Sequence, residues 1–193
     1  MHTLLDQIPM TAKSSRKKIG FTHRKRLGLE STAKQSQKEV LSFSKILELV
    51  QRAKKRGLTI VTSNGCFDIL HIGHLRNLEY AKRHGDILIV GINSDNSVKR
   101  IKGPQRPIVP SEERAAMLAA LKPVDAVFIY NEDTPEKWLA KLAPNVHVKG
   151  ADRREREIPE KKIVLEGGGR LVLAPITKSR STSALISRIR SLK

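Results

Sequence analysis

Two histidines, His71 and His74, have a residue type and a spacing that suit phosphate chemistry. Imidazole N–H groups can donate to phosphate oxygens while charge moves between those oxygens. Gly73, which lies between the histidines, lets a ligand approach the backbone closely. A single histidine here would more often be packed or solvated, and a metal site is a further alternative, although no third ligand is evident. The pair therefore favours phosphate chemistry, with a catalytic role expected for both histidines.

A strand and a helix are needed to hold these histidines. An apolar run predicts a buried strand over residues 58–63, and a helical apolar spacing predicts a helix over residues 73–84. A helix N-terminus presents N–H groups and a partial positive charge, which suit a phosphate. The turn between the two elements contains Cys66. A small residue filling this turn is a simpler interpretation of Cys66 than a nucleophile, because transfer to a phosphate oxygen needs none.

The rest of the chain alternates strands and helices. Further strands are predicted over residues 86–92, 124–130, 145–149 and 170–174. Helices are predicted over residues 43–56, 112–121, 135–142, 159–166 and 181–191, with a short helix from residue 93 and a basic loop over residues 99–110. Right-handed crossovers then give an α/β fold, a Rossmann-like doubly wound five-stranded parallel sheet. Ligands bind outside the carboxyl ends of such strands, so the loops after strands one, two and four should share one edge.

Local signals mark several helix ends. The expected signals are Gly57 as the stop of the first helix, Ser111 and Ser181 as N-caps, and Thr134 as an N-cap followed by Pro135 at the first helical position. Trp138 is expected to pack its helix on the sheet.

Residues 65–74, Gly-Cys-Phe-Asp-Ile-Leu-His-Ile-Gly-His, resemble the HIGH motif of the nucleotidyltransferase superfamily. Residues 63–71, 90–95 and 148–152 are similar to D-glycero-β-D-manno-heptose 1-phosphate adenylyltransferases, and the resemblance covers about residues 40–190. It implies an enzyme that transfers AMP from ATP, with Mg²⁺, to the heptose 1-phosphate, giving ADP-heptose and pyrophosphate for lipopolysaccharide core synthesis. The related bifunctional enzymes carry a sugar kinase domain before this region, so a stand-alone transferase is expected here.

The resemblance and the charges together suggest roles for individual residues. Lys102, in the basic loop, is expected to join the histidines in catalysis by holding a phosphate. Nucleotide binding is expected of residues in the motif turn and at the start of the last helix: Gly65, Cys66, Phe67, Asp68, Gly73, Ser181 and Thr182. Acceptor binding is expected of Asn93, Asp95, Arg106, Arg114, Lys149 and Asp152. Arg114 lies in the first turn of its helix, where the dipole disfavours a cation, which suggests an anionic partner. No metal held by protein side chains is expected, because Mg²⁺ bridging phosphates keeps most of its waters.

A cytidylyltransferase acting on glycerol 3-phosphate or another small polyol phosphate is the second interpretation. Residues 178–183 resemble the superfamily's C-terminal Ser-Thr-Thr motif, but Ser183 replaces the final threonine. Ile176 and Lys178 stand where cytidylyltransferases have an arginine and an acidic residue. These departures favour ATP over CTP, although spacing alone does not choose the base.

The charge of the chain limits its partners. It has 193 residues and a formal net charge of +18, which favours anionic ligands such as a nucleoside triphosphate and a sugar phosphate. Residues 1–39 predict a basic flexible tail, and residues 40–193 predict one nucleotidyltransferase domain. The seven aromatic residues (four Phe, two Tyr and one Trp) form no visible stacking platform, so no specific nucleic-acid partner is expected. A nucleic-acid-binding protein on an inactive fold is the alternative from a different class.

Targeting signals and cysteine usage suggest a location. No apolar stretch is long enough to span a membrane, and no secretory signal is evident. The one cysteine cannot form an internal disulfide, which fits a reducing compartment. A cytoplasmic enzyme without membrane contact is expected, and a homodimer is left open.

Overall fold

Five short strands form the centre of the fold. The computed structural model describes residues 40–151, 158–175 and 181–192, and its strands are β1 (Ile60–Gly65), β2 (Ile87–Asn93), β3 (Ala126–Tyr130), β4 (Val146–Gly150) and β5 (Arg170–Ala174). Neighbouring strands pair in parallel, in the order β3-β2-β1-β4-β5. Their nearly continuous apolar sequences suit a sheet covered on both faces. The predicted Rossmann-like parallel sheet is confirmed.

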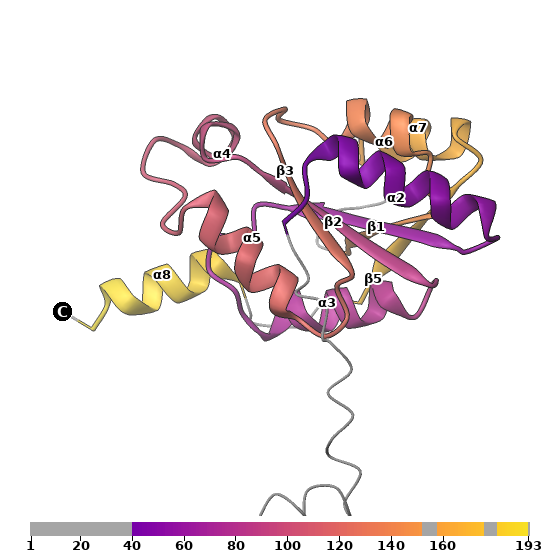
Figure 1. The fold of residues 1–193 in the computed structure, drawn as a ribbon. Helices are drawn as coiled ribbons and strands as arrows, with labels where there is room; N and C mark the ends of the chain where they lie inside the picture. Colours follow the sequence, from indigo (N-terminus) through magenta and orange to yellow (C-terminus); the bar gives the residue numbers. More distant parts are fainter. Residues whose placement is uncertain (1–39, 152–157, 176–180, 193) are drawn as a thin grey trace, which may run out of the picture. The chain divides into compact units, whose positions relative to one another are not determined.

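Helices cover both faces of this sheet (Figure 1). One face carries α2 (Phe43–Lys55), α6 (Glu136–Leu142) and α7 (Lys161–Glu166), and the other carries α3 (Ile72–Lys82) and α5 (Ser111–Ala120). Side chains alternate along β1, because Ile60 packs with α2 and α6 whereas Val61 packs with α3 and α5. Two further helices, α4 (Asp95–Lys102) and α8 (Thr182–Arg190), follow β2 and β5.

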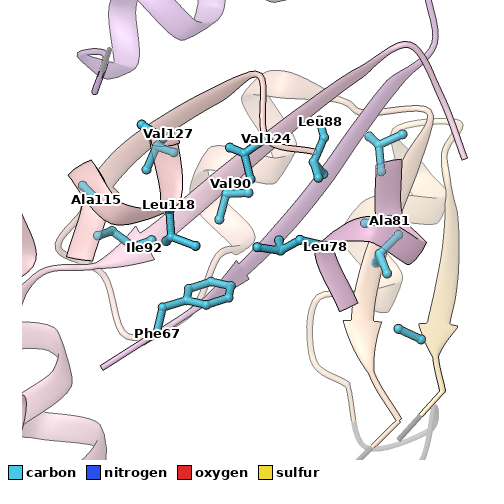
Figure 2. Packing of buried hydrophobic residues seen from close by; sticks show 14 of the residues in the cluster. Phe67, Leu78, Ala81, Leu88, Val90, Ile92, Ala115, Leu118, Val124 and Val127 are labelled. Carbon is cyan, nitrogen blue, oxygen red and sulfur yellow. The ribbon is translucent and has the colours of Figure 1, made fainter. Parts of the chain in front are cut away.

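The core beneath α3 and α5 anchors the turn after β1. Figure 2 shows the ring of Phe67 in the same cluster as Leu78 of α3 and Val90 of β2. Phe67 is 7% exposed and has a φ of 48°, a left-handed conformation that is uncommon outside glycine. Such a conformation costs about 1–3 kcal/mol, and burying an aromatic ring returns about the same amount. Phe67, predicted to bind nucleotide, therefore fixes the turn through the core.

Trp138 packs α6 on the sheet, as predicted. It is 3% exposed, and its ring meets that of Phe128 edge-on, with centroids 5.2 Å apart. A Cβ placed on Gly91 of β2 would lie 3.1 Å from the Trp138 ring. The glycine therefore leaves room for the indole on this face of β2.

The ends of three helices confirm or extend the predictions. Gly57 has a φ of 71° and follows the C-cap of α2, as predicted. Ser181 caps α8 by accepting the N–H of Ala184 at 3.1 Å, also as predicted. The predicted loop over residues 99–110 begins later, because residues 99–102 complete α4.

Two predicted caps are wrong. Pro110 occupies the N-cap position of α5, and Ser111 is the first helical residue, with its hydroxyl directed to Glu112. Pro135 likewise occupies the N-cap position of α6, so Thr134 lies one residue outside it. In both helices, the proline takes the flanking position that the sequence pattern gave to a hydroxyl residue.

Two predictions concern residues outside the described part of the chain, namely the basic tail of residues 1–39 and the acceptor-binding role of Asp152. Within the described part, no helix is long and apolar enough to cross a membrane.

Candidate active site

Three loops meet at the carboxyl edge of the sheet, as predicted. Gly65 of β1 pairs with Ile92 of β2, and Ser63 of β1 pairs with Val148 of β4. The turn after β1 is therefore flanked by the ends of β2 and β4. The strand order reverses between β1 and β4, which is where open parallel sheets bind ligands.

His71 and His74 lie at the start of α3 with their rings stacked. The ring centroids are 3.8 Å apart and the planes differ by 20°, while Phe67 lies 5.1 Å from His74. His71 also caps the helix, because its Nδ1 accepts the N–H of Gly73 at 3.1 Å. In a neutral ring, Nε2 then carries the proton and is the donor. The structure thus brings both predicted catalytic residues together and fixes the tautomer of one.

The backbone at the start of α3 offers fewer donors than the sequence predicted. The Gly73 N–H is taken by His71, and those of His74 and Leu75 lie 2.9 and 3.4 Å from the His71 carbonyl. A helix N-terminus ordinarily leaves its first N–H groups, such as those of Gly73 and His74, without a partner. The start of α3 therefore offers few open backbone donors, and the donors predicted to act on a phosphate are the imidazole N–H groups.

His74 is held in its neutral form. Burial, with a smaller contribution from His71, lowers the pKa of His74 to about 4. Its Nδ1 is buried and has no hydrogen-bond partner within the described ranges. Nε2 is then the ring nitrogen that can act on a ligand. A fixed donor here gains strength as negative charge develops on a phosphate.

The lowered pKa of His74 predicts a loss of stability in acid. The unfolded chain protonates this residue near pH 6.5 and the folded chain near pH 4, so between these values the unfolded state binds more protons. Acidification from pH 7 to pH 5 should therefore cost wild type about 1–2 kcal/mol more than His74→Asn. Urea unfolding at both pH values measures this difference in the free energy of unfolding. Burial also lowers the pKa of His147, but His147 is present in both proteins, so its contribution to the acid sensitivity cancels in the comparison. Equal losses in the two proteins would contradict the assignment.

Asp68 holds the loop after α4 against the motif turn. Its Oδ1 accepts the N–H groups of Ile108 and Val109 at 2.8 and 2.9 Å, and its Oδ2 accepts a hydrogen bond from Arg106 Nε. The side chain of Asp68 is 1% exposed. Asp68, predicted to bind nucleotide, is thus placed to orient Arg106, whose terminal guanidinium nitrogens can still meet a phosphate.

Arg114 is buried at the centre of this edge. Its guanidinium donates to the carbonyl oxygens of Cys66, Asn93 and Val109 and pairs with Asp95 at 2.6 Å. The residue is 1% exposed. The anionic partner inferred for Arg114 is therefore found within the protein, in Asp95. Arg114 links the motif turn, the end of β2 and the loop before α5. Its ion pair also engages the carboxylate of Asp95, another residue predicted to bind the acceptor.

Lys102 lies near the motif turn. Burial raises the pKa of the Cys66 thiol, and the cations of Lys102, Arg114 and Arg106 partly offset that rise, with Lys102 the strongest of the three. Lys102 ends α4 and is exposed, so its ammonium can reach a ligand beside the turn. The raised pKa keeps the Cys66 thiol protonated, which agrees with a residue that fills the turn and does not act as a nucleophile.

A directed chain of hydrogen bonds crosses the sheet edge. Lys149 Nζ donates to Asn64 Oδ1 at 2.9 Å, and Asn64 Nδ2 donates to Tyr130 Oη at 3.0 Å. The Tyr130 hydroxyl donates to Asn93 Oδ1 at 3.2 Å, and Asn93 Nδ2 donates to Ser97 Oγ at 2.9 Å. Because an ammonium only donates, the direction of every later bond is fixed. The chain orients Asn93 and Lys149, both predicted to bind the acceptor.

Sequence reasoning missed Asn64, Tyr130 and Glu160. Tyr130 pairs with Asn93 at the end of β3, so its position at a strand end could have indicated it. Asn64 lies at the end of β1 and gave the same signal. Glu160 precedes α7 and lies 2.7 Å from Lys149 Nζ, a contact that no local pattern indicates.

The last helix begins beside the loop that leads to His71. The hydroxyl of Thr182 donates to the carbonyl oxygen of Ile69 at 3.2 Å. Ser181 and Thr182, both predicted to bind nucleotide, therefore lie close to the motif turn. Gly65, in the same group, packs against Phe67, since a Cβ there would lie 3.2 Å from the ring.

Comparison with known proteins shows that this chain is a nucleotidyltransferase enzyme. A family model described as cytidylyltransferase-like matches residues 62–168, which is more than half of the chain. The chain therefore belongs to the cytidylyltransferase-like family.

Individual relatives agree with this assignment. The bifunctional protein HldE of Gluconacetobacter diazotrophicus is 46% identical over 152 residues, covering 79% of this chain and 31% of that protein. The bifunctional protein HldE of Syntrophotalea carbinolica is 43% identical over 142 residues, covering 74% of this chain and 29% of that protein. A crystal structure of a lipopolysaccharide core biosynthesis protein from Thermoplasma volcanium is 30% identical with a TM-score of 0.53, covering 64% of this chain and 100% of that chain. The chain thus spans about a third of the length of the curated relatives it matches.

Proposed function

We propose that this nucleotidyltransferase transfers AMP from ATP to D-glycero-β-D-manno-heptose 1-phosphate, giving ADP-heptose and pyrophosphate. The stacked pair of His71 and His74 at the reversal of strand order carries the proposal for nucleotidyl transfer. The choice of acceptor is supported by the resemblance of residues 63–71, 90–95 and 148–152 to heptose 1-phosphate adenylyltransferases. The similarity to a lipopolysaccharide core biosynthesis protein supports a role in that synthesis.

In the proposed reaction, the protein forms no covalent bond with the substrates. An oxygen of the sugar phosphate attacks the α-phosphorus of ATP, and the bond from that phosphorus to the bridging oxygen breaks, with pyrophosphate leaving on the electron pair. The attacking oxygen is already an anion, so no general base is needed. Catalysis is then mainly positioning and stabilisation of phosphate charge. His71 and His74 donate to the oxygens of the α-phosphate, Lys102 contacts the leaving phosphates, and Arg106 binds the phosphate of the acceptor.

Magnesium is expected to bind together with the nucleotide, as part of the substrate. The described residues contain no group of three or more His, Cys, Asp or Glu side chains placed to hold a metal ion. Asp68 and Asp95, two of the described carboxylates at this edge, are both engaged by arginines. The side chains therefore suit MgATP as a substrate, with the ion carried by phosphate oxygens and water.

A cytidylyltransferase acting on glycerol 3-phosphate or another small polyol phosphate is the second candidate, favoured by the description of the matching family. Pyrophosphate release should be measured with ATP and with CTP against a panel of sugar and polyol phosphates. We expect turnover with ATP and the heptose 1-phosphate and little with CTP. Turnover restricted to CTP and glycerol 3-phosphate would overturn the choice.

A further inference from the structure

Glu160 is a buried carboxylate next to the candidate site, with no part in the chemistry above. It is 2% exposed and lies just before α7. Its Oε1 is 2.7 Å from Lys149 Nζ and 3.8 Å from His147 Nε2. Burial raises the pKa of Glu160, but His147 and Lys149 outweigh that effect and hold the pKa at about 2. Glu160 is therefore ionised and paired with the Lys149 ammonium.

Lys149 lies at the reversal of strand order, and contacts within the protein leave part of its side chain exposed. Its side chain is 23% exposed. Within the described ranges, its ammonium has two partners, Glu160 Oε1 and Asn64 Oδ1, at 2.7 and 2.9 Å. An ammonium has three donors, and its hydrogen bond in the described part of the chain goes to Asn64, which leaves N–H capacity for a ligand. The hydrogen bond to Asn64 and the ion pair with Glu160 hold the ammonium in place.

We propose that Glu160 positions Lys149 to bind a hydroxyl group of the acceptor sugar, which makes the pair a determinant of acceptor specificity. This inference rests on the proposed function and deepens it. Glu160 is a positioning residue, because it acts on the ligand through Lys149.

The charge balance explains why a hydroxyl fits this place better than a phosphate. The Lys149–Glu160 pair is nearly neutral as a unit, so it adds little attraction for a dianion. It still offers one well-oriented charged donor, which suits the lone pair of a neutral hydroxyl. The network through Asn64 and Tyr130 holds that donor in place without adding charge. In the proposed mechanism, the phosphates are bound by four other residues: His71, His74, Lys102 and Arg106.

Monodeoxy derivatives of the acceptor test this inference. The readout is kcat/KM for the full acceptor divided by kcat/KM for each derivative, measured at saturating nucleotide. Wild type should show one hydroxyl whose removal costs about tenfold or more, because a site built to bind a hydroxyl leaves its donor unpaired without it. In Lys149→Met, and to a similar extent in Glu160→Gln, that one ratio should fall to near unity while KM for the nucleotide stays unchanged.

Two further variants keep the result interpretable. The double variant Glu160→Gln/Lys149→Met leaves no buried charge unpaired, so it should fold, and it should show no larger loss than Lys149→Met alone. Glu166→Gln is the matched control, because Glu166 ends α7, the helix that Glu160 precedes, and forms an exposed pair with Lys162 at 3.8 Å. It should keep the wild-type ratios.

Unchanged ratios in Lys149→Met and the double variant, or a lower melting temperature with unchanged acceptor KM in Glu160→Gln, would overturn the inference. The acceptor is whichever compound the panel described above identifies. If that compound is a polyol phosphate and not the heptose 1-phosphate, the proposed function fails, whereas the deoxy series on that acceptor still decides the role of Glu160.

Discussion

His74→Ala should lower kcat and kcat/KM together by about 10²–10³, because loss of one preorganised donor to developing charge has a cost of this size. The Nδ1 of the ring is buried, so the expected loss is that of Nε2 as a donor to the α-phosphate. His71→Ala should act similarly, and the double variant should lose less than the product of the two effects, because both rings stabilise one charge. Steady-state kinetics beside circular dichroism melts measure the effect.

His84→Ala is the matched control for this prediction. His84 follows α3, and its Nδ1 lies 2.9 Å from the carbonyl oxygen of Tyr80, away from the motif turn. Its replacement should leave kcat within a few-fold of wild type. A folded His74→Ala protein with full kcat would show that His74 is a packing residue.

Arg114→Met should destabilise the fold by about 3–5 kcal/mol, the usual cost of removing one member of a buried, hydrogen-bonded charge network. The guanidinium satisfies three carbonyl oxygens and pairs with Asp95, and a methionine can replace none of these contacts. The midpoint of urea unfolding, with the slope unchanged, measures the loss.

Arg100→Met provides the comparison, since Arg100 pairs with Asp133 at 2.7 Å but the two side chains are 48% and 50% exposed. An exposed ion pair contributes little to stability because water and salt screen it, so this variant should unfold close to wild type. If Arg114→Met kept wild-type stability but no longer bound the acceptor, Arg114 would face the ligand and the positioning role would be wrong.

The sheet could be predicted from the sequence because its strands are apolar runs of the right length, bounded by turns. The five predicted strands correspond to β1 to β5, and their alternation with helices implied parallel pairing. The helix ends were harder to predict from the sequence. Pro110 and Pro135 take the N-cap positions assigned to Ser111 and Thr134, because the fixed φ of proline suits the residue that leads into a helix.

The sequence predicted that the candidate site residues gather at one edge of the sheet, but it did not predict their partners within the protein. Strand ends placed His71, Asn93 and Lys149 at one edge. Whether a charged side chain there meets a ligand or the protein depends on contacts far apart in the chain. Asp68 binds Arg106, 38 residues away, and Arg114 binds the Cys66 carbonyl, 48 residues away. No local pattern encodes such partners, so the sequence could not show that both side chains are engaged within the protein.

Label transfer from ATP is the most direct test of the central claim, which is attack on the α-phosphorus at the His71–His74 site. The full chain should be incubated with the heptose 1-phosphate and ATP labelled with ³²P in either the α- or the γ-position. Attack on the α-phosphorus predicts that the α-label enters the sugar nucleotide and the γ-label enters pyrophosphate, with both transfers reduced about 10²–10³-fold in His74→Ala. Appearance of the γ-label in the sugar product would contradict the account.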